Sequence, residues 1–191
     1  MDKLVIGFDL DGVLIDHTEN KLRVVTERGW CITLAQTPSD VLQVLLPHDV
    51  WHEVKIILYD EPKISLTPPL MAETDTCLER LTRAGIKYFL ISCRRHPENA
   101  IALMQQRGLW PKYFDHKNAY FVEKPQDKNE KARLCGITHY LDDELSVLER
   151  LVDVPHRFHL DQFSIASTSS FERVTSLPQF IDCVLGATSE A

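Results

Sequence analysis

Short apolar runs recur along the chain and alternate with stretches of helical periodicity. Residues 3–8 (KLVIGF), 87–92 (KYFLIS) and 138–142 (THYLD) are rich in apolar residues, and each predicts a buried strand. Residues 156–160 (HRFHL) and 119–122 (AYFV) predict two further strands. Strands that alternate with helices favour an α/β fold with a mostly parallel sheet.

The stretches between these runs carry the signals that start and stop helices. Pro68 stands in the first turn of a predicted helix that Gly85 ends, and Pro97 and Gly108 delimit the next one. Three more helices are predicted for the stretches DKNEKARLCG, DDELSVLERL and LPQFIDCVL.

Residues 17–66 break this alternation. They contain helical fragments but no convincing strand, and they are longer than a crossover between two strands needs. We therefore predict a core made of residues 1–16 and 67–191, with residues 17–66 as a small helical cap inserted after the first strand.

The amino-acid composition and net charge limit the class of protein and the kinds of binding partner that we expect. With 191 residues, 44% hydrophobic residues and a net charge of −7, the chain is typical of a globular domain and unlike a nucleic-acid-binding surface. No apolar stretch is long enough to span a bilayer, so we expect a cytoplasmic protein without membrane or nucleic-acid polymer partners. The five scattered cysteines are expected to be reduced thiols.

Polar residues follow three of the predicted strands. Asp9 and Asp11 end the first, Ser92 ends the second, and Asp142 and Asp143 end the third. Because ligands of a parallel sheet bind at the carboxyl ends of its strands, we expect these side chains to form one site. Acidic residues spaced as in DxD, or standing at the start of a helix, are also common in solvent-exposed turns and as helix caps. The prediction of a functional site therefore depends on all of these residues standing at strand ends on the same edge of the sheet.

Three further residues extend this candidate site. Lys128 opens the helix before the third strand, and Lys124 is an alternative to it. Gly12 allows a sharp turn after the two acids, and Arg94 follows the Ser92 strand end, where it would contact substrate or pair with a surface acid.

This set of residue types points to phosphate chemistry. A few carboxylates that would otherwise repel one another suit Mg²⁺, which binds oxygen ligands and substrate phosphates. A carboxylate can attack phosphorus, and a second acid can protonate the leaving oxygen and then activate water. A hydroxyl and a lysine would hold the phosphoryl oxygens. We therefore expect a small phosphorylated substrate as the partner.

The quoted motifs resemble those of one known family. FDLDGVL, YFLIS, DKNEKARLCGI and HYLDDE are similar, in this order, to the four motifs of the haloacid dehalogenase-like (HAD) hydrolase superfamily, and they cover residues 4–143. The resemblance implies a three-layer, Rossmann-like parallel sheet with helices on both faces. The small insertion is similar to the cap of cytosolic deoxyribonucleotidase-like phosphatases.

The resemblance also implies a role for each matching residue. Asp9 would be the nucleophile and a Mg²⁺ ligand, and Asp11 the general acid and base, with its backbone carbonyl on the metal. Ser92 would bind phosphoryl oxygens, and Lys128 (or Lys124) would neutralise charge on the phosphoaspartate. The resemblance also implies that Asp143 is the better candidate for the direct metal ligand of the last pair, with Asp142 supporting it.

The function so implied is that of a Mg²⁺-dependent phosphatase acting on a small phosphomonoester, such as a nucleotide or another phosphorylated metabolite, through an aspartyl-phosphate. A phosphotransferase or mutase with the same nucleophile, or a non-catalytic binding protein on the same scaffold, are the alternatives. A receiver-like signalling module is disfavoured, because Ser92 stands where its phospho-acceptor would be.

Overall fold

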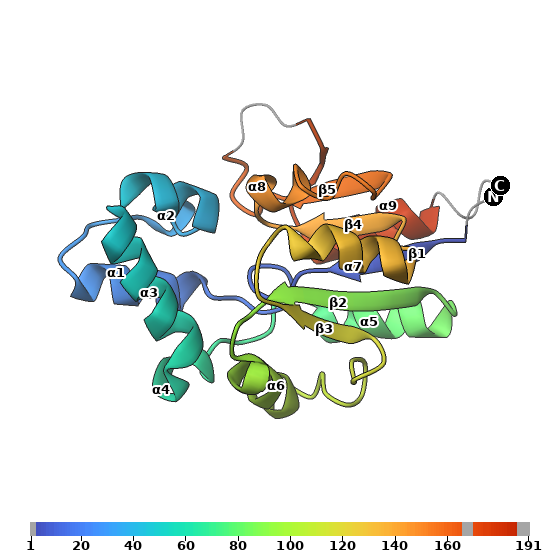
Figure 1. Ribbon diagram of the computed structural model, residues 1–191, viewed down its shortest axis with the longest axis horizontal. Coiled ribbons are helices and arrows are strands. Elements are labelled where there is room, and N and C mark those ends of the chain that lie inside the picture. Colours follow the sequence, from blue (N-terminus) through green and yellow to red (C-terminus); the bar gives the residue numbers. More distant parts are fainter. Residues whose placement is uncertain (1–2, 166–169, 187–191) are drawn as a thin grey trace.

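The computed structural model describes residues 3–165 and 170–186. Their centre is a parallel sheet in which the strands follow the order β3-β2-β1-β4-β5-β6 (Figure 1). The strands are β1 (Val5–Phe8), β2 (Lys87–Cys93), β3 (Ala119–Val122), β4 (His139–Asp142), β5 (His156–Leu160) and β6 (Glu172–Val174). The predicted α/β fold is confirmed. The short strand β6 has no counterpart among the predicted strands.

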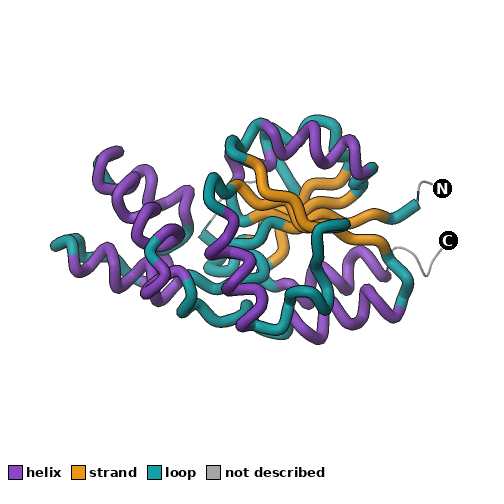
Figure 2. The backbone as a smooth tube through the Cα atoms, turned by 60° about the horizontal axis from the view of Figure 1, so that its bottom comes forward, coloured by secondary structure: helices purple, strands orange, loops and turns teal. Residues whose placement is uncertain are grey.

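Helices cover both faces of the sheet (Figure 2). In chain order the helices are α1 (Thr18–Glu27), a 3₁₀ turn (Leu34–Gln36), α2 (Ser39–Leu45), α3 (His48–Asp60), α4 (Pro62–Ser65), α5 (Thr74–Arg83), α6 (Pro97–Gln106), α7 (Asp127–Cys135), α8 (Leu145–Leu148) and α9 (Leu177–Gly186). None of them, in the part of the chain that is described, is long and apolar enough to cross a bilayer. All five cysteines are free thiols.

The alternation of side chains along each strand divides the apolar residues between the two faces. Ile6 and Leu90 pack with α5, α6 and α9 in one buried cluster, whereas Val5, Phe89 and Ile91 pack with α7 and α8 in another. This period of two is what a β-strand imposes. Both faces are apolar, which explains why the strands read as continuous apolar runs in the sequence.

Gly7 occupies a position in β1 that no larger residue can fill. A Cβ atom there would lie 2.4 Å from the ring of Tyr140, on the neighbouring strand β4. The Tyr140 hydroxyl donates a hydrogen bond to the Ile91 carbonyl on β2 (2.8 Å). The Tyr140 ring therefore lies across β1 and links β4 to β2. These are the three strands whose ends carry the predicted site residues.

Helices α1 to α4 form a separate group on one side of the sheet (Figure 1). They surround their own buried cluster, which consists of Val24, Val25, Leu42, Leu46, Trp51, Val54 and Leu58. Residues 17–66, all of which are described, contain no strand. The group belongs to the insertion predicted from the sequence.

The chain enters and leaves this group through two adjacent segments. Ile15 forms an antiparallel bridge with Leu70, and the Asp16 N–H donates to the Pro69 carbonyl (2.9 Å). The helix expected from Pro68 onward therefore begins only at Thr74, since Leu70 is engaged in this pairing. Tertiary pairing here outweighs the helix-start signal of proline.

Candidate active site

The predicted site residues lie where the three central strands end. Asp9 directly follows β1, Asp142 is the last residue of β4, and Ser92 stands near the end of β2. Because β1 pairs with both β2 and β4, the three side chains share one edge of the sheet. The Asp9 N–H donates to the Leu141 carbonyl (3.1 Å), which fixes the backbone on which the carboxylate stands.

Lys128 lies at the centre of this group. From the first turn of α7, its Nζ donates to Asp9 Oδ1 (2.7 Å) and to Asp142 Oδ2 (2.9 Å). Burial lowers the pKa of Lys128, but the two carboxylates outweigh this effect and raise it well above its usual value. Lys124 is exposed in the loop before α7. The structure thus brings Lys128, and not Lys124, to the carboxylates.

Three carboxylates form a group that can hold a cation. Asp9, Asp142 and Asp143 each offer an oxygen, and these oxygens lie within 4.8 Å of one another. Burial is the main cause that raises the pKa of Asp142 to about 7 and that of Asp143 well above its usual range, and neighbouring acids add to both. A divalent cation would offset this cost, and oxygen donors alone are what Mg²⁺ prefers. The residues therefore fit the predicted ion.

The two adjacent acids differ in their hydrogen bonds. Asp142 uses Oδ2 for Lys128 and Oδ1 for the Glu144 N–H (3.0 Å). The carboxylate of Asp143 accepts no hydrogen bond from any residue that the structure describes. This difference favours Asp143 as a direct metal ligand and Asp142 as the partner of the lysine.

Gly12 allows Asp143 to approach the turn after β1. Its φ is +84°, and a Cβ atom at this position would lie 2.3 Å from Asp143 Oδ2. A side chain would therefore meet both backbone strain and a direct collision. The predicted sharp turn thus also makes room for the carboxylate cluster.

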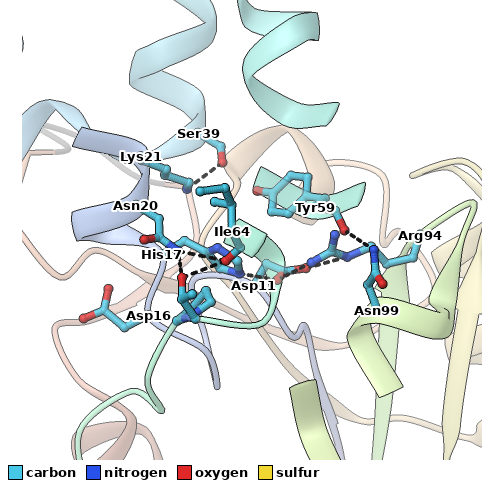
Figure 3. Close-up of polar contacts among 12 residues, drawn as sticks. Asp11, Asp16, His17, Asn20, Lys21, Ser39, Tyr59, Ile64, Arg94 and Asn99 are labelled. Carbon is cyan, nitrogen blue, oxygen red and sulfur yellow. Dashed lines mark hydrogen bonds and ion pairs between the residues drawn. The ribbon is translucent and has the colours of Figure 1, made fainter. Parts of the chain in front are cut away.

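The Asp11 carboxylate has two side-chain partners, Arg94 and His17 (Figure 3). The Arg94 guanidinium donates twice, from Nε to Oδ2 (3.0 Å) and from Nη2 to Oδ1 (2.6 Å), and His17 Nε2 lies 2.7 Å from Oδ1. Burial raises the pKa of Asp11, but Arg94 and His17 outweigh it and hold the pKa well below its usual range. The Asp11 carboxylate is outside the group of cation-binding oxygens.

Arg94 is buried and contacts Asp11, where we expected it to contact substrate or a surface acid. Its guanidinium also lies 4.0 Å from the ring centroid of Tyr59, which α3 contributes. The Asp11 carboxylate, Arg94 and Tyr59 thus join the sheet edge to the insertion. Ser92 is buried near them and lines a cavity of about 200 Å³ together with Asp9 and Lys128.

Three residues near the site were not among the predicted site residues. His17 precedes α1, Lys21 lies one turn further along that helix, and Tyr59 comes from the end of α3. His17 and Lys21 are both buried, at 1% and 4% exposure, although polar residues of an inserted helix usually face solvent. The close spacing of His17 to the first motif is the only sequence signal for their position.

Comparison with solved structures identifies the class of fold. Among eight similar structures, at 11–15% sequence identity and with nearly complete coverage of both chains, six are described as HAD or haloacid dehalogenase-like hydrolases. At such identities the likeness establishes the shared fold. No protein-family model and no curated protein matches the chain.

Three of these structures illustrate the similarity. A HAD family hydrolase from Deinococcus radiodurans R1, with bound phosphate and sodium, has a TM-score of 0.65 and 15% identity over 98% of this chain and 97% of its own. A haloacid dehalogenase-like hydrolase from Bacteroides fragilis has a TM-score of 0.64 and 15% identity over 93% and 99%. A Thermotoga maritima protein described as a β-phosphoglucomutase has a TM-score of 0.61 and 14% identity over 96% and 99%. The deoxyribonucleotidase-like subtype stays a prediction.

Proposed function

We infer that this chain is a Mg²⁺-dependent phosphomonoester hydrolase that acts through a phosphoaspartate on Asp9. The observation that carries this inference is the double contact of Lys128 with Asp9 and Asp142, beside a third carboxylate within cation-binding distance. The phosphate bound to the Deinococcus radiodurans hydrolase supports the same type of ligand.

The first half-reaction transfers the phosphoryl group to the protein. A carboxylate oxygen of Asp9 forms a bond to phosphorus while the bond from phosphorus to the ester oxygen breaks. Asp11, in its acid form, gives its proton to the departing oxygen. Ser92 donates to a phosphoryl oxygen, and the Lys128 ammonium offsets the negative charge that gathers there.

The second half-reaction releases phosphate. Asp11, now a carboxylate, takes a proton from water as the water oxygen attacks phosphorus, and the bond to Asp9 breaks. Mg²⁺, held by Asp9, Asp143 and the supporting Asp142, would supply positive charge to the phosphate when bound. Since Arg94 and His17 favour the ionised form of Asp11, bound substrate must weaken one of these contacts before the first step.

The test is hydrolysis of para-nitrophenyl phosphate by the purified protein with Mg²⁺. Asp9→Asn should lower turnover by at least about a thousandfold, because the amide is a poor nucleophile. The exposed Asp49 offers a matched control, so Asp49→Asn should retain activity. Mass spectrometry of the rapidly quenched protein should find one added phosphoryl group on the peptide that contains Asp9. Wild-type turnover by Asp9→Asn, or undiminished turnover in excess chelator, would refute the proposal.

Phosphoryl transfer to an acceptor other than water is the second candidate, favoured by the Thermotoga maritima neighbour described as a β-phosphoglucomutase. It uses the same Asp9 and differs only in the second half-reaction. Adding sugar phosphates to the assay separates the two functions. A mutase would form an isomeric or bisphosphorylated sugar, whereas a hydrolase would release inorganic phosphate at the same rate as it consumes ester.

A further inference from the structure

The loop after β4 carries two of the three carboxylates of the candidate cation site. Part of its backbone is held within the loop, since Asp142 Oδ1 accepts a hydrogen bond from the Glu144 N–H (3.0 Å). The Glu144 carbonyl accepts one from the Val147 N–H (3.1 Å), at the start of α8. The Leu145 N–H, which lies between these two donors in the chain, has its partner outside the loop. The contact of Leu145 therefore determines how firmly this end of the loop is held.

Asp40 of the insertion is the partner of Leu145. Its Oδ2 accepts the hydrogen bond from the Leu145 N–H at 2.6 Å, across 105 positions of the chain. Asp40 is the second residue of α2, the helix of the insertion that lies towards α8 (Figure 1). Its Oδ1 accepts from Gln43 Nε2 (3.0 Å), so both oxygens are engaged and the carboxylate is held in this orientation. The insertion thus contacts the loop directly.

This contact lies beside the cation site. Asp40, Asp143 and Leu145 line the same cavity, of about 170 Å³. A hydrogen bond to an ionised acceptor is roughly twice as strong as one between neutral groups, and it strengthens where water is partly excluded. The Asp40 carboxylate is partly buried. It can therefore hold the Leu145 N–H more firmly than a water molecule or a neutral side chain would.

The direction of the Asp143 carboxylate depends on this support. Asp142 is bonded to Lys128 and to the Glu144 N–H, whereas the Asp143 carboxylate accepts no hydrogen bond from any residue that the structure describes. The backbone on either side of Asp143 must therefore set its direction. Residues that orient a metal ligand typically contribute about 10–100-fold to metal affinity.

We propose that Asp40 is a positioning residue for the cation site: it fixes, through the Leu145 N–H, the loop that presents Asp142 and Asp143 to the ion. Cation binding and docking of the insertion then favour each other, because an ion that binds more tightly to the held loop must strengthen the Asp40 contact by the same factor. The proposal rests on the proposed function for the identity of the ion, but not for turnover.

The opposite side of the insertion provides a contact that separates direct positioning from general loosening. Asn99 on α6 donates from Nδ2 to the carbonyl oxygens of Tyr59 (3.4 Å) and Asp60 (2.8 Å), at the end of α3. These hydrogen bonds join the insertion to the core without contacting the loop after β4. If Asp40 acts directly on that loop, losing the Asn99 contacts should leave cation affinity unchanged.

The test measures binding of the metal ion alone. Mn²⁺ is titrated into the metal-free, full-length protein, and free Mn²⁺ is followed by electron paramagnetic resonance, since Mn²⁺ takes the same oxygen ligands as Mg²⁺. Asp40→Ala should raise the dissociation constant about tenfold. Asp40→Asn keeps an oxygen that can accept from the Leu145 N–H, so it should restore most of the affinity.

Two control variants should bind Mn²⁺ as the wild-type protein does. Asp49→Ala removes an exposed acid from the same position in the first turn of α3 as Asp40 has in α2. It therefore matches the loss of charge and of helix-end stabilisation without a contact to the loop. Asn99→Ala loosens the insertion at its other attachment.

The reciprocal effect is measured in the wild-type protein, and so does not depend on how well any variant folds. Mg²⁺ should slow amide hydrogen exchange in α2 as well as at Leu145, because the ion strengthens the contact between them. In Asp40→Ala the slowing in α2 should disappear. A residue that only stabilised the fold would not make exchange in α2 depend on the ion.

Unchanged Mn²⁺ affinity in Asp40→Ala, equal losses in Asp40→Asn and Asp40→Ala, or an equal loss in Asn99→Ala would each overturn the proposal. So would exchange in wild-type α2 that does not respond to Mg²⁺. Mn²⁺ binding that depends on Asp40, in a protein that hydrolyses no phosphomonoester, would instead refute the phosphatase function and leave the role of Asp40 in place. The two failures are thus distinguishable.

Discussion

The edge of the sheet and the helical insertion both contribute to the site, but they are built in different ways. The side chains of the sheet edge are fixed by backbone pairing, in which Phe8 stands between Leu90 and Leu141. The insertion has its own small apolar cluster and contacts the site through single side chains, notably His17 and Tyr59.

This difference in construction suggests that the two regions have different functions. The groups that would carry out phosphoryl transfer stand on strands buried on both faces, so they cannot move without breaking the core. The insertion is joined to the core by the paired segments at Ile15 and Leu70, and it contributes His17 and Tyr59 beside Asp11 and Arg94. We therefore expect damage to the sheet edge to abolish chemistry, and damage to the insertion to change stability locally or to alter selectivity.

The largest expected effect separates the two candidate lysines. Lys128→Met removes the cation between Asp9 and Asp142, and turnover of para-nitrophenyl phosphate should fall about a thousandfold, as for other donors that stabilise a developing charge. Lys124→Met, at an exposed position, is the control and should stay within about twofold of wild type. Equal losses in both variants would contradict the assignment of Lys128.

A pair of leucine variants compares the two cores directly. Leu90→Ala in the sheet and Leu58→Ala in the insertion both open a cavity at a fully buried position, and each should cost about 3 kcal/mol locally. Leu90→Ala should lower the free energy of global unfolding, measured by urea denaturation. Leu58→Ala should speed amide hydrogen exchange mainly in α1 to α4. Uniformly faster exchange in Leu58→Ala would show that the insertion and the sheet unfold as one unit.

Two glycines with the same backbone angle test the crowding at the acidic cluster. Gly12 and Gly29 both have φ of +84°, but an added methyl group would collide with Asp143 at Gly12 and would meet no atom within 4 Å at Gly29. Each change to alanine should cost about 1–2 kcal/mol of folding free energy because of backbone strain. Gly12→Ala should in addition lower turnover by about a hundredfold, since it displaces a carboxylate. Unchanged turnover in Gly12→Ala would show that Asp143 tolerates displacement.

The smallest expected effect concerns His139, which stands at the start of β4, at the other end of this strand from Asp142. Burial, with a smaller contribution from His156, lowers the pKa of His139 to about 4, and the two rings stack at 4.4 Å. The unfolded chain therefore takes up a proton at a higher pH than the folded protein. This contribution to stability is complete above the usual histidine pKa and is lost as the pH falls from about 6.5 towards 4.

Because His139 is partly exposed, we expect a loss of only about 1 kcal/mol over that range after solvent screening. Urea denaturation at several pH values measures it, and the His139→Phe variant should lack that part of the pH dependence. A variant with the same slope as wild type would assign the effect to other groups.

The sequence predicted best those elements whose position depends mainly on one interaction, the burial of apolar side chains. Apolar runs predicted β1, β2 and β4 and therefore the positions of Asp9 and Ser92 at their ends. Strand β6, with one buried residue among three, has too little apolar character to be recognised. Helix α8 covers only Leu145–Leu148, because the acids before it belong to the strand end and the site.

Long-range contacts explain what sequence reasoning could not decide. The sequence favours Lys128 over Lys124 only slightly, and the placement of α7 against β1 and β4 is what brings Lys128 to the carboxylates. The pairing of Arg94 with Asp11 depends on a side-chain conformation that no local pattern encodes.

The central place of β1 has a consequence for how the protein is synthesised. Val5 pairs with Lys87 and Ile6 with His139, so the strand that precedes the proposed nucleophile must wait for both partners to be translated. Sheets with such distant pairings fold slowly and expose apolar edges in the meantime. A ribosome-bound chain that stops before β4 would therefore hold Asp9 beside an open strand, and activity should arise only in the last stage of folding.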